Sequence, residues 1–170
     1  MNNIYIDFDE TLTNSISSIL YILNKQYGTN VKAEEVKSWD FTDCFPNLKV
    51  EELENLFSSD DFFKHLTWKP YMKSLLYLTS KYNITIVTKG DKINLQKKQQ
   101  WLKEQGFEHI NFIGLDLQIS KGMIDMSDGI FIDDNQWNLQ ESNAKYKLLF
   151  ENYTNCEWNN EWKGDRICIQ

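Results

Sequence analysis

The sequence predicts an α/β fold built on a doubly wound, mainly parallel sheet. Helical and strand-like apolar patterns alternate along most of the chain, as they do in strand–helix–strand units. The 170 residues are 41% apolar and 25% charged, which suits one ordinary domain that carries a modest insertion. Seven glycines and two prolines are too few for a collagen-like or disordered chain.

The first part of the chain begins with a strand over residues 3–7, where apolar side chains cluster. A helix follows from Asn14 or Ser15, either of which is a residue type that caps helices. Its apolar residues recur at helical spacing until Gly28, which is expected to end it. Two short helices are expected next, over residues 33–38 and 50–58, with Pro46 in the loop between them.

The second part returns to strand–helix alternation. Pro70 suits the first turn of a helix that runs to about Lys81. The β-branched run at 84–88 predicts a buried strand, and the helix expected over 92–105 ends at Gly106. Further strands are expected near residues 110–113, 129–133 and 146–150, and the last twenty residues show no clear pattern.

Mostly helical sequence interrupts the alternation between about residues 14 and 67. We interpret residues 14–67 as a helical cap inserted after the first strand, and residues 1–13 and 68–170 as the core domain. Ligands of open α/β sheets bind beyond the carboxyl ends of the strands. The cap is therefore expected to cover that edge of the sheet.

Charge and composition limit the partners. A net charge of −7 argues against binding to duplex nucleic acid, and the densest basic pair, Lys97-Lys98, fits the solvated face of a helix. A membrane span needs about 20 apolar residues, and no apolar stretch approaches that length. The first residues also lack the basic segment that begins a signal peptide. Three widely spaced cysteines fit reduced thiols, so a cytoplasmic location is expected.

Acidic side chains follow two of the predicted strands. Asp7 and Asp9 come at the end of the first strand and leave it on one side, because strand side chains alternate. Two carboxylates at such a short distance repel each other unless a cation or a proton lies between them. Asp134, after the strand at 129–133, completes three oxygen ligands of the kind that Mg²⁺ accepts.

Two further side chains suit a phosphoryl group. Thr88 offers a hydroxyl donor at the end of a strand, and Lys121 offers a compact positive charge. An aspartate nucleophile, a second carboxyl group for acid/base work, a metal and a lysine form a phosphoryl-transfer site with an aspartyl-phosphate intermediate. A calcium loop is a poorer explanation, because it requires Gly and Glu where this chain has Leu12 and Ser18. A receiver domain has no second aspartate pair after its lysine.

The order of these groups resembles the haloacid dehalogenase (HAD) superfamily of phosphohydrolases. Its elements here are Asp-x-Asp-x-Thr at residues 7–11, then Thr88, Lys121 and the pair Asp133-Asp134. Within that superfamily the chain resembles the 5′(3′)-deoxyribonucleotidases. This likeness rests on Asp61-Phe62-Phe63, Leu66 and Pro70 ahead of the strand that ends at Thr88, on the size of the cap, and on Phe131-Ile132-Asp133-Asp134.

The resemblance implies a role for each matching residue. Asp7 is the expected nucleophile and Asp9 the general acid and then base. Mg²⁺ is expected on Asp7, the backbone carbonyl of Asp9, and Asp134, with Asp133 steadying the metal-bound water or the lysine. Thr88 and Lys121 are expected to hold the phosphate. The chain departs from the family at Glu10, where Gly is common, at Lys89-Gly90, where Ser-Pro is common, and at Ser15, where an aromatic residue often stands.

The cap is rich in aromatic residues, which in a small helical insertion more often form its core than a ligand surface. An aromatic face also stacks well on a nucleobase. The candidates for substrate contact are Trp39, Phe41, Phe63 and Lys89.

The leading functional hypothesis is therefore an Mg²⁺-dependent phosphatase that releases phosphate from small esters, foremost (deoxy)nucleoside monophosphates. The alternatives are a HAD phosphatase for another small phosphate ester, and a nucleotide- or phosphate-binding module with little turnover. The sequence leaves open the preferred base and sugar, the choice between 5′ and 3′ esters, and the oligomeric state, a homodimer included.

Overall fold

The computed structural model describes residues 2–152 and 156–168, and these residues contain one six-stranded sheet in which all neighbouring strands are parallel. Its strand order, β3-β2-β1-β4-β5-β6, is that of a doubly wound fold. The predicted fold class is thus confirmed. The strands are β1 (Asn3–Ile6), β2 (Asn83–Lys89), β3 (Asn111–Leu115), β4 (Gly129–Asp133), β5 (Tyr146–Glu151) and β6 (Arg166–Cys168).

The direction of winding changes between β1 and β4, the two central strands. Ile4 of β1 is in register with Ile84 of β2 on one side and with Ile130 of β4 on the other. The ladder continues one residue past β1, because the Asp7 amide donates to the Ile132 carbonyl at 2.9 Å. Asp7 and the end of β4 therefore lie side by side at the switch point, where ligands of such sheets bind.

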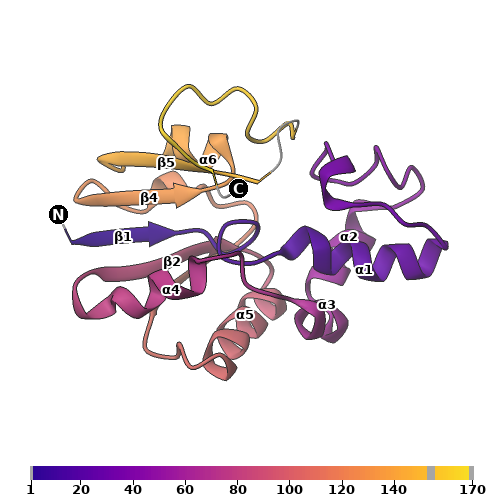
Figure 1. Cartoon of the computed structure of the whole chain (residues 1–170), viewed down its shortest axis with the longest axis horizontal. Coiled ribbons are helices and arrows are strands. Elements are labelled where there is room, and N and C mark those ends of the chain that lie inside the picture. Colours follow the sequence, from indigo (N-terminus) through magenta and orange to yellow (C-terminus); the bar gives the residue numbers. More distant parts are fainter. Residues whose placement is uncertain (1, 153–155, 169–170) are drawn as a thin grey trace.

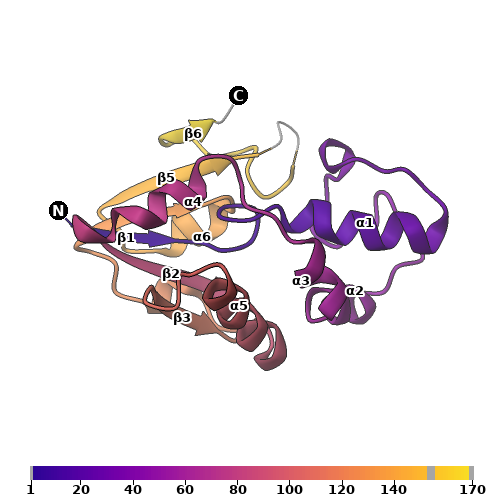
Figure 2. The same ribbon diagram turned by 60° about the horizontal axis from the view of Figure 1, so that its bottom comes forward.

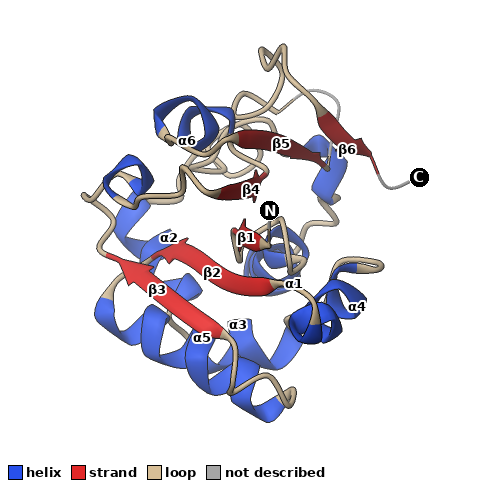
Figure 3. Ribbon diagram, turned by 90° about the vertical axis from the view of Figure 1, so that its left-hand side faces the viewer, coloured by secondary structure: helices blue, strands red, loops and turns tan. Residues whose placement is uncertain are grey.

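Helices cover both faces of the sheet. The short α4 (Met72–Leu76) and the longer α5 (Lys92–Glu104) lie on one face, and α6 (Gln136–Glu141) lies on the other (Figure 3). Right-handed crossovers produce this arrangement, because the strands progress in opposite directions from β1. The buried side of α5 is formed by positions 94, 98, 101 and 102, one stripe at helical spacing.

The segment 14–67, the cap, lies beyond the carboxyl end of β1 (Figures 1 and 2). It contains α1 (Ser15–Tyr27), the 3₁₀ turn η1 (Ala33–Glu35), α2 (Val50–Phe57) and α3 (Asp60–His65). The two connections between the core and the cap lie side by side. There the Asn14 amide donates to the Thr67 carbonyl at 2.9 Å, and Thr13 forms an antiparallel bridge with Trp68. The division at residues 14 and 67 stays a prediction.

Several expected elements differ in extent. The helix expected over 33–38 is only the turn η1. The helix expected from Pro70 begins at Met72, because Tyr71 has a φ of 65° and cannot belong to it, and it continues as the 3₁₀ helix η2 (Tyr77–Ser80). Helix α3 was not expected, although Ser59 is a good cap whose hydroxyl accepts from the Phe62 amide at 3.1 Å.

Helix α1 ends as predicted and begins differently. Gly28 follows it with a φ of 66°, the left-handed conformation that a glycine adopts without strain. Asn14 occupies the cap position, but its side chain makes no capping bond. The free Ile16 amide donates instead to Glu10 Oε1 at 2.7 Å. Glu10 itself has a φ of 53°, which explains why glycine suits this position.

The three cysteines, Cys44, Cys156 and Cys168, are free thiols, as their number predicted. Across residues 2–152 and 156–168, every helix is too short or too polar to span a lipid bilayer.

The close contact of β1 and β4 gives a first prediction. A Cβ added at Gly129 would lie 2.7 Å from the Asn3 carbonyl oxygen, so Gly129→Ala must displace backbone in the centre of the sheet. We expect a loss of about 1–3 kcal/mol, measured as a lower urea midpoint at unchanged slope. Gly114→Ala in β3 is the matched control, because its Cβ would meet side chains and no backbone, with Leu95 at 3.0 Å and Phe112 at 3.1 Å. An equal or larger loss at Gly114 would contradict this account.

Candidate active site

Asp7 lies at the carboxyl end of β1, buried beneath a cleft. Its Oδ1 accepts a hydrogen bond from the Lys121 amine, and Oδ2 accepts none from the described residues. Burial raises the pKa of Asp7 to about 7, with Asp133 and Asp9 adding to the effect of burial and Lys121 opposing it. One carboxylate oxygen is thus held in place while the other remains available to a ligand.

Lys121, in the 3₁₀ turn η3 (Lys121–Met123), bridges two acids. Its amine also donates to Asp133 Oδ2 at 2.7 Å. Burial disfavours the charge, but Asp133 and Asp7 more than offset this and raise the pKa of Lys121 above its usual value. Asp133 is itself fully occupied, since it accepts from the Asn135 amide at 2.8 Å and from Asn138 Nδ2 at 3.1 and 3.2 Å. Asp133 therefore positions the lysine.

Asp134 is buried and, among the described residues, pairs with no lysine. Its Oδ2 accepts from Trp158 Nε1 at 2.9 Å, and its amide donates to the Thr11 hydroxyl at 3.0 Å. Burial raises the pKa of Asp134 well above its usual value, and the neighbouring acids, led by Asp133 and Asp7, raise it further. This carboxylate is held by neutral donors, and its charge is uncompensated.

A divalent cation would resolve this imbalance. Asp7, Asp133 and Asp134 each offer a carboxylate oxygen, and these oxygens lie within 4.8 Å of one another. When all three buried acids are ionised, the one lysine leaves an excess of two negative charges, which costs free energy unless a cation or protons join them. The donors are hard oxygens, as Mg²⁺ prefers. Because Asp133 is committed to Lys121 and its neighbours, the available ligands are Asp7 and Asp134.

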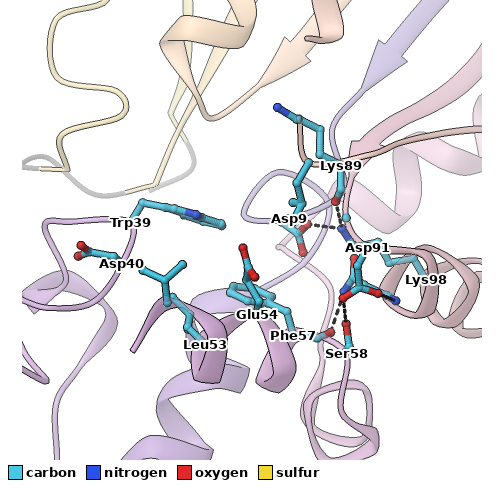
Figure 4. A pocket seen from close by; sticks show the side chains of 14 residues that line it. Asp9, Trp39, Asp40, Leu53, Glu54, Phe57, Ser58, Lys89, Asp91 and Lys98 are labelled. Atoms are coloured by element: carbon cyan, nitrogen blue, oxygen red, sulfur yellow. Dashed lines mark hydrogen bonds and ion pairs between the residues drawn. The ribbon is translucent and has the colours of Figure 1, made fainter. Parts of the chain in front are cut away.

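Asp9 lies outside this cluster but lines the same cleft. Ser15 donates to its Oδ1 at 2.7 Å, and the amine of Lys98 donates to its Oδ2 at 2.5 Å (Figure 4). The same amine donates to the buried Thr88 hydroxyl at 2.9 Å, which connects the ends of β1 and β2. The expectation that Lys97 and Lys98 lie on a solvated helix face is wrong for Lys98. Its side chain is 1% exposed, whereas that of Lys97 is 31% exposed.

A cleft of about 460 Å³ lies above the acids, and a hollow of about 100 Å³ adjoins it. Both are lined by Asp9, Trp39, Val50, Glu54, Lys89 and Leu117. Of the four candidates for substrate contact, Trp39 and Lys89 line the cleft. Phe41 is buried in the cap, and Phe63 lines a separate surface hollow beside α5. The structure therefore brings together two of the four.

Residues from the cap and from the C-terminal segment complete the cleft. Trp39 is half exposed and stacks on Phe57 at 5.6 Å between ring centroids, with its edge toward Trp158. Glu54 of α2 points into the cleft toward Asp9 (Figure 4). No sequence pattern indicated Glu54 as a lining residue, or Trp158 as a partner of Asp134.

Glu10 forms another buried ion pair, at the base of the cap. Its Oε2 lies 2.6 Å from the Lys69 amine, with 1% and 6% of the side chains exposed. Burial raises the pKa of Glu10, against the effect of Lys69. Glu10 also accepts from the Ile16 amide at the start of α1, and Lys69 follows the segment by which the chain returns from the cap. The ion pair therefore links the two connections between the cap and the core.

Solved structures with a similar fold come from several bacteria. A predicted phosphatase from Clostridium acetobutylicum is 17% identical, with a TM-score of 0.61 over 99% of this chain and 94% of that one. A HAD-superfamily hydrolase of Geobacter sulfurreducens is 10% identical, with a TM-score of 0.61 over 98% and 91%. Protein Tyrosine Kinase A of Mycobacterium tuberculosis is 14% identical, with a TM-score of 0.62 over 97% and 92%. No curated protein matches the chain in sequence.

The sheet order and these neighbours show that the chain has the α/β fold of the HAD-superfamily hydrolases. The sequence model of one family matches residues 1–166, nearly the whole chain. The chain belongs to the family described as 5′ nucleotidase, deoxy (pyrimidine), cytosolic type C (NT5C).

The pair at the base of the cap yields a second prediction. Lys69→Met leaves the Glu10 carboxylate buried without its lysine, and breaking such a pair costs about 3–5 kcal/mol. The double variant Glu10→Gln/Lys69→Met removes the unpaired charge and should recover a large part of that loss. Denaturant unfolding of both variants measures the difference. If Lys69→Met were as stable as the wild type, the account of a buried ion pair would be wrong.

Proposed function

We propose that this protein is an Mg²⁺-dependent phosphomonoesterase that acts on (deoxy)nucleoside monophosphates through a phosphorylated Asp7. The observation that carries the proposal is the cluster of Asp7, Asp133 and Asp134 around Lys121 at the floor of the cleft. Such a cluster holds a cation and a phosphoryl group against a carboxylate nucleophile. The family and its cytosolic description support a nucleotide substrate and a cytoplasmic location.

In the first step, a carboxylate oxygen of Asp7 attacks phosphorus in line with the leaving alcohol. A new bond forms between Asp7 and phosphorus, and the bond from phosphorus to the ester oxygen breaks. Asp9 gives its proton to that oxygen, so the product leaves as a neutral alcohol. Lys121 and the Thr88 hydroxyl are placed to balance charge on the transferring group.

In the second step, water attacks the phosphorus of the Asp7 phosphate, and Asp9, now ionised, takes the proton from that water. The bond between Asp7 and phosphorus breaks, which releases inorganic phosphate and restores both carboxyl groups. The cap residues that line the cleft exclude bulk water during these steps.

Asp7 and Asp134 would hold Mg²⁺, with the predicted backbone carbonyl of Asp9 as a third ligand. A bound Mg²⁺ neutralises charge on the phosphate oxygens and on the two acids. Asp133 acts next to it by holding Lys121.

Asp7→Asn is the direct test of this mechanism. The amide is no nucleophile, so phosphate release from every active ester should fall to the uncatalysed rate, while circular dichroism shows an unchanged fold. Chelation of divalent ions should abolish turnover by the wild-type enzyme, and added Mg²⁺ should restore it. Turnover retained by Asp7→Asn would exclude Asp7 as the nucleophile, and turnover in the chelator would exclude the metal.

The substrate class is tested with nucleoside 5′- and 3′-monophosphates beside sugar phosphates. Stacking of a base on an aromatic side chain contributes about 1–3 kcal/mol, so Trp39→Ala should raise KM for nucleotides by about 10-fold or more. KM for ribose 5-phosphate, which has no base, should stay unchanged and serves as the control. Sugar phosphates turned over faster than every nucleotide would indicate another small ester as the substrate.

A further inference from the structure

Lys98 of α5 uses its whole hydrogen-bonding capacity inside the site. A lysine ammonium has three protons and no acceptor. The Lys98 amine donates to Asp9 Oδ2 at 2.5 Å, to Thr88 Oγ1 at 2.9 Å and to the Lys89 carbonyl at 2.9 Å. These three partners come from the loop after β1 and from the end of β2.

The remaining side of the ammonium is closed. Its nitrogen lies 5.2 Å from the centre of the Phe8 ring, and the side chain is 1% exposed. Helix α5 determines this location, because Lys98 lies between Asn94 and Trp101 on the buried stripe of the helix. A buried ammonium that has three oxygen acceptors and an aromatic face is held in one geometry, and it has no donor left for a substrate.

The chemistry of the lysine restricts Asp9. Because Lys98 only donates, Oδ2 of Asp9 must be an acceptor. Any proton that Asp9 carries then lies on Oδ1, which can donate it while still accepting from Ser15 at 2.7 Å. The ion pair also fixes the rotation of the carboxyl group. Lys98 therefore determines which oxygen of Asp9 is able to protonate a leaving group.

The same reasoning applies to Thr88. Its hydroxyl oxygen accepts from Lys98, so its single proton stays free for another acceptor. No described residue accepts that proton, and a phosphate oxygen above the end of β2 would. Lys98 thus orients a donor as well as an acid.

We propose that Lys98 is a positioning residue for the general acid Asp9 and, secondarily, for the phosphate donor Thr88. This inference rests on the proposed function. It assigns Lys98 a different role from Lys121, which holds Asp7 directly. Lys98 lines the hollow beside the cleft, but its three protons are already donated, so it has none left for a substrate.

The test uses two leaving groups. In p-nitrophenyl phosphate the leaving group departs without protonation, whereas an alkyl phosphate needs the acid. The rate of the first step is measured in a single turnover, with nitrophenyl phosphate and with the alkyl phosphate that the wild-type enzyme hydrolyses fastest. Lys98→Met should slow the alkyl ester by about 100-fold and the nitrophenyl ester by less than about tenfold. Equal slowing of both esters, or of neither, would overturn the proposal.

Lys97→Met is the matched control. Lys97 precedes Lys98 on the same helix, and its amine donates to Asp60 at 2.6 Å and to the Ser58 carbonyl at 2.8 Å, with no contact to Asp9 or Thr88. The ratio of the two esters' rates should equal that of the wild type. A shift in this variant as large as that in Lys98→Met would mean that any lysine lost from α5 has the effect, which would also overturn the proposal.

If Lys98→Met does not fold, the double variant Asp9→Asn/Lys98→Met avoids a buried unpaired carboxylate. Its single-turnover rate with saturating nitrophenyl phosphate should lie within about tenfold of that of Asp9→Asn, because Lys98 acts mainly through Asp9 and only secondarily through Thr88. A further loss of more than about tenfold would exclude that role. A wild-type enzyme inactive on every ester would instead refute the proposed function itself, before any variant is compared.

Discussion

The structure depends on how it compensates carboxylates buried at the end of β1. Three acids lie within four residues of the chain, and desolvation opposes the ionised forms of the two that are buried, Asp7 and Glu10. Each is paired with its own lysine from a distant part of the chain. The pairs are Asp7 with Lys121, Asp9 with Lys98, and Glu10 with Lys69. These lysines bring together the loop after β1, helix α5, turn η3 and the segment that returns from the cap.

One buried carboxylate, that of Asp134, has no lysine partner among the described residues, and it lies where the chemistry is expected. Asp134 has Trp158 and Thr11 as neutral partners, so the cluster retains negative charge at the floor of the cleft. A fully neutralised cluster would be more stable and would have less need of a cation. The pair of Glu10 and Lys69 serves a different purpose, because it anchors both connections of the cap beside the same cluster.

The sequence predicted the parts of the site that follow strand ends. Asp7, Thr88 and Asp134 were foreseen because a parallel sheet brings the carboxyl ends of its strands to one edge. Lys98 was missed because adjacent lysines on a helix usually face solvent, although its spacing from Trp101 and Leu102 indicates the buried stripe. Trp158 contacts Asp134 from a turn after β5, and such a turn has no periodic signal in the sequence. Phe41 and Phe63 show that aromatic composition alone does not separate the core of the cap from the surface that faces a ligand.

A crystal structure of the protein with Mg²⁺ and beryllium trifluoride, a mimic of the phosphoryl group, tests the central claim most directly. The account predicts trifluoroberyllate on a carboxylate oxygen of Asp7, within reach of Lys121 and Thr88, and one metal ion bound by Asp7 and Asp134. Asp133 should still hold Lys121. A metal ion bound away from Asp134, or trifluoroberyllate on any residue other than Asp7, would contradict it.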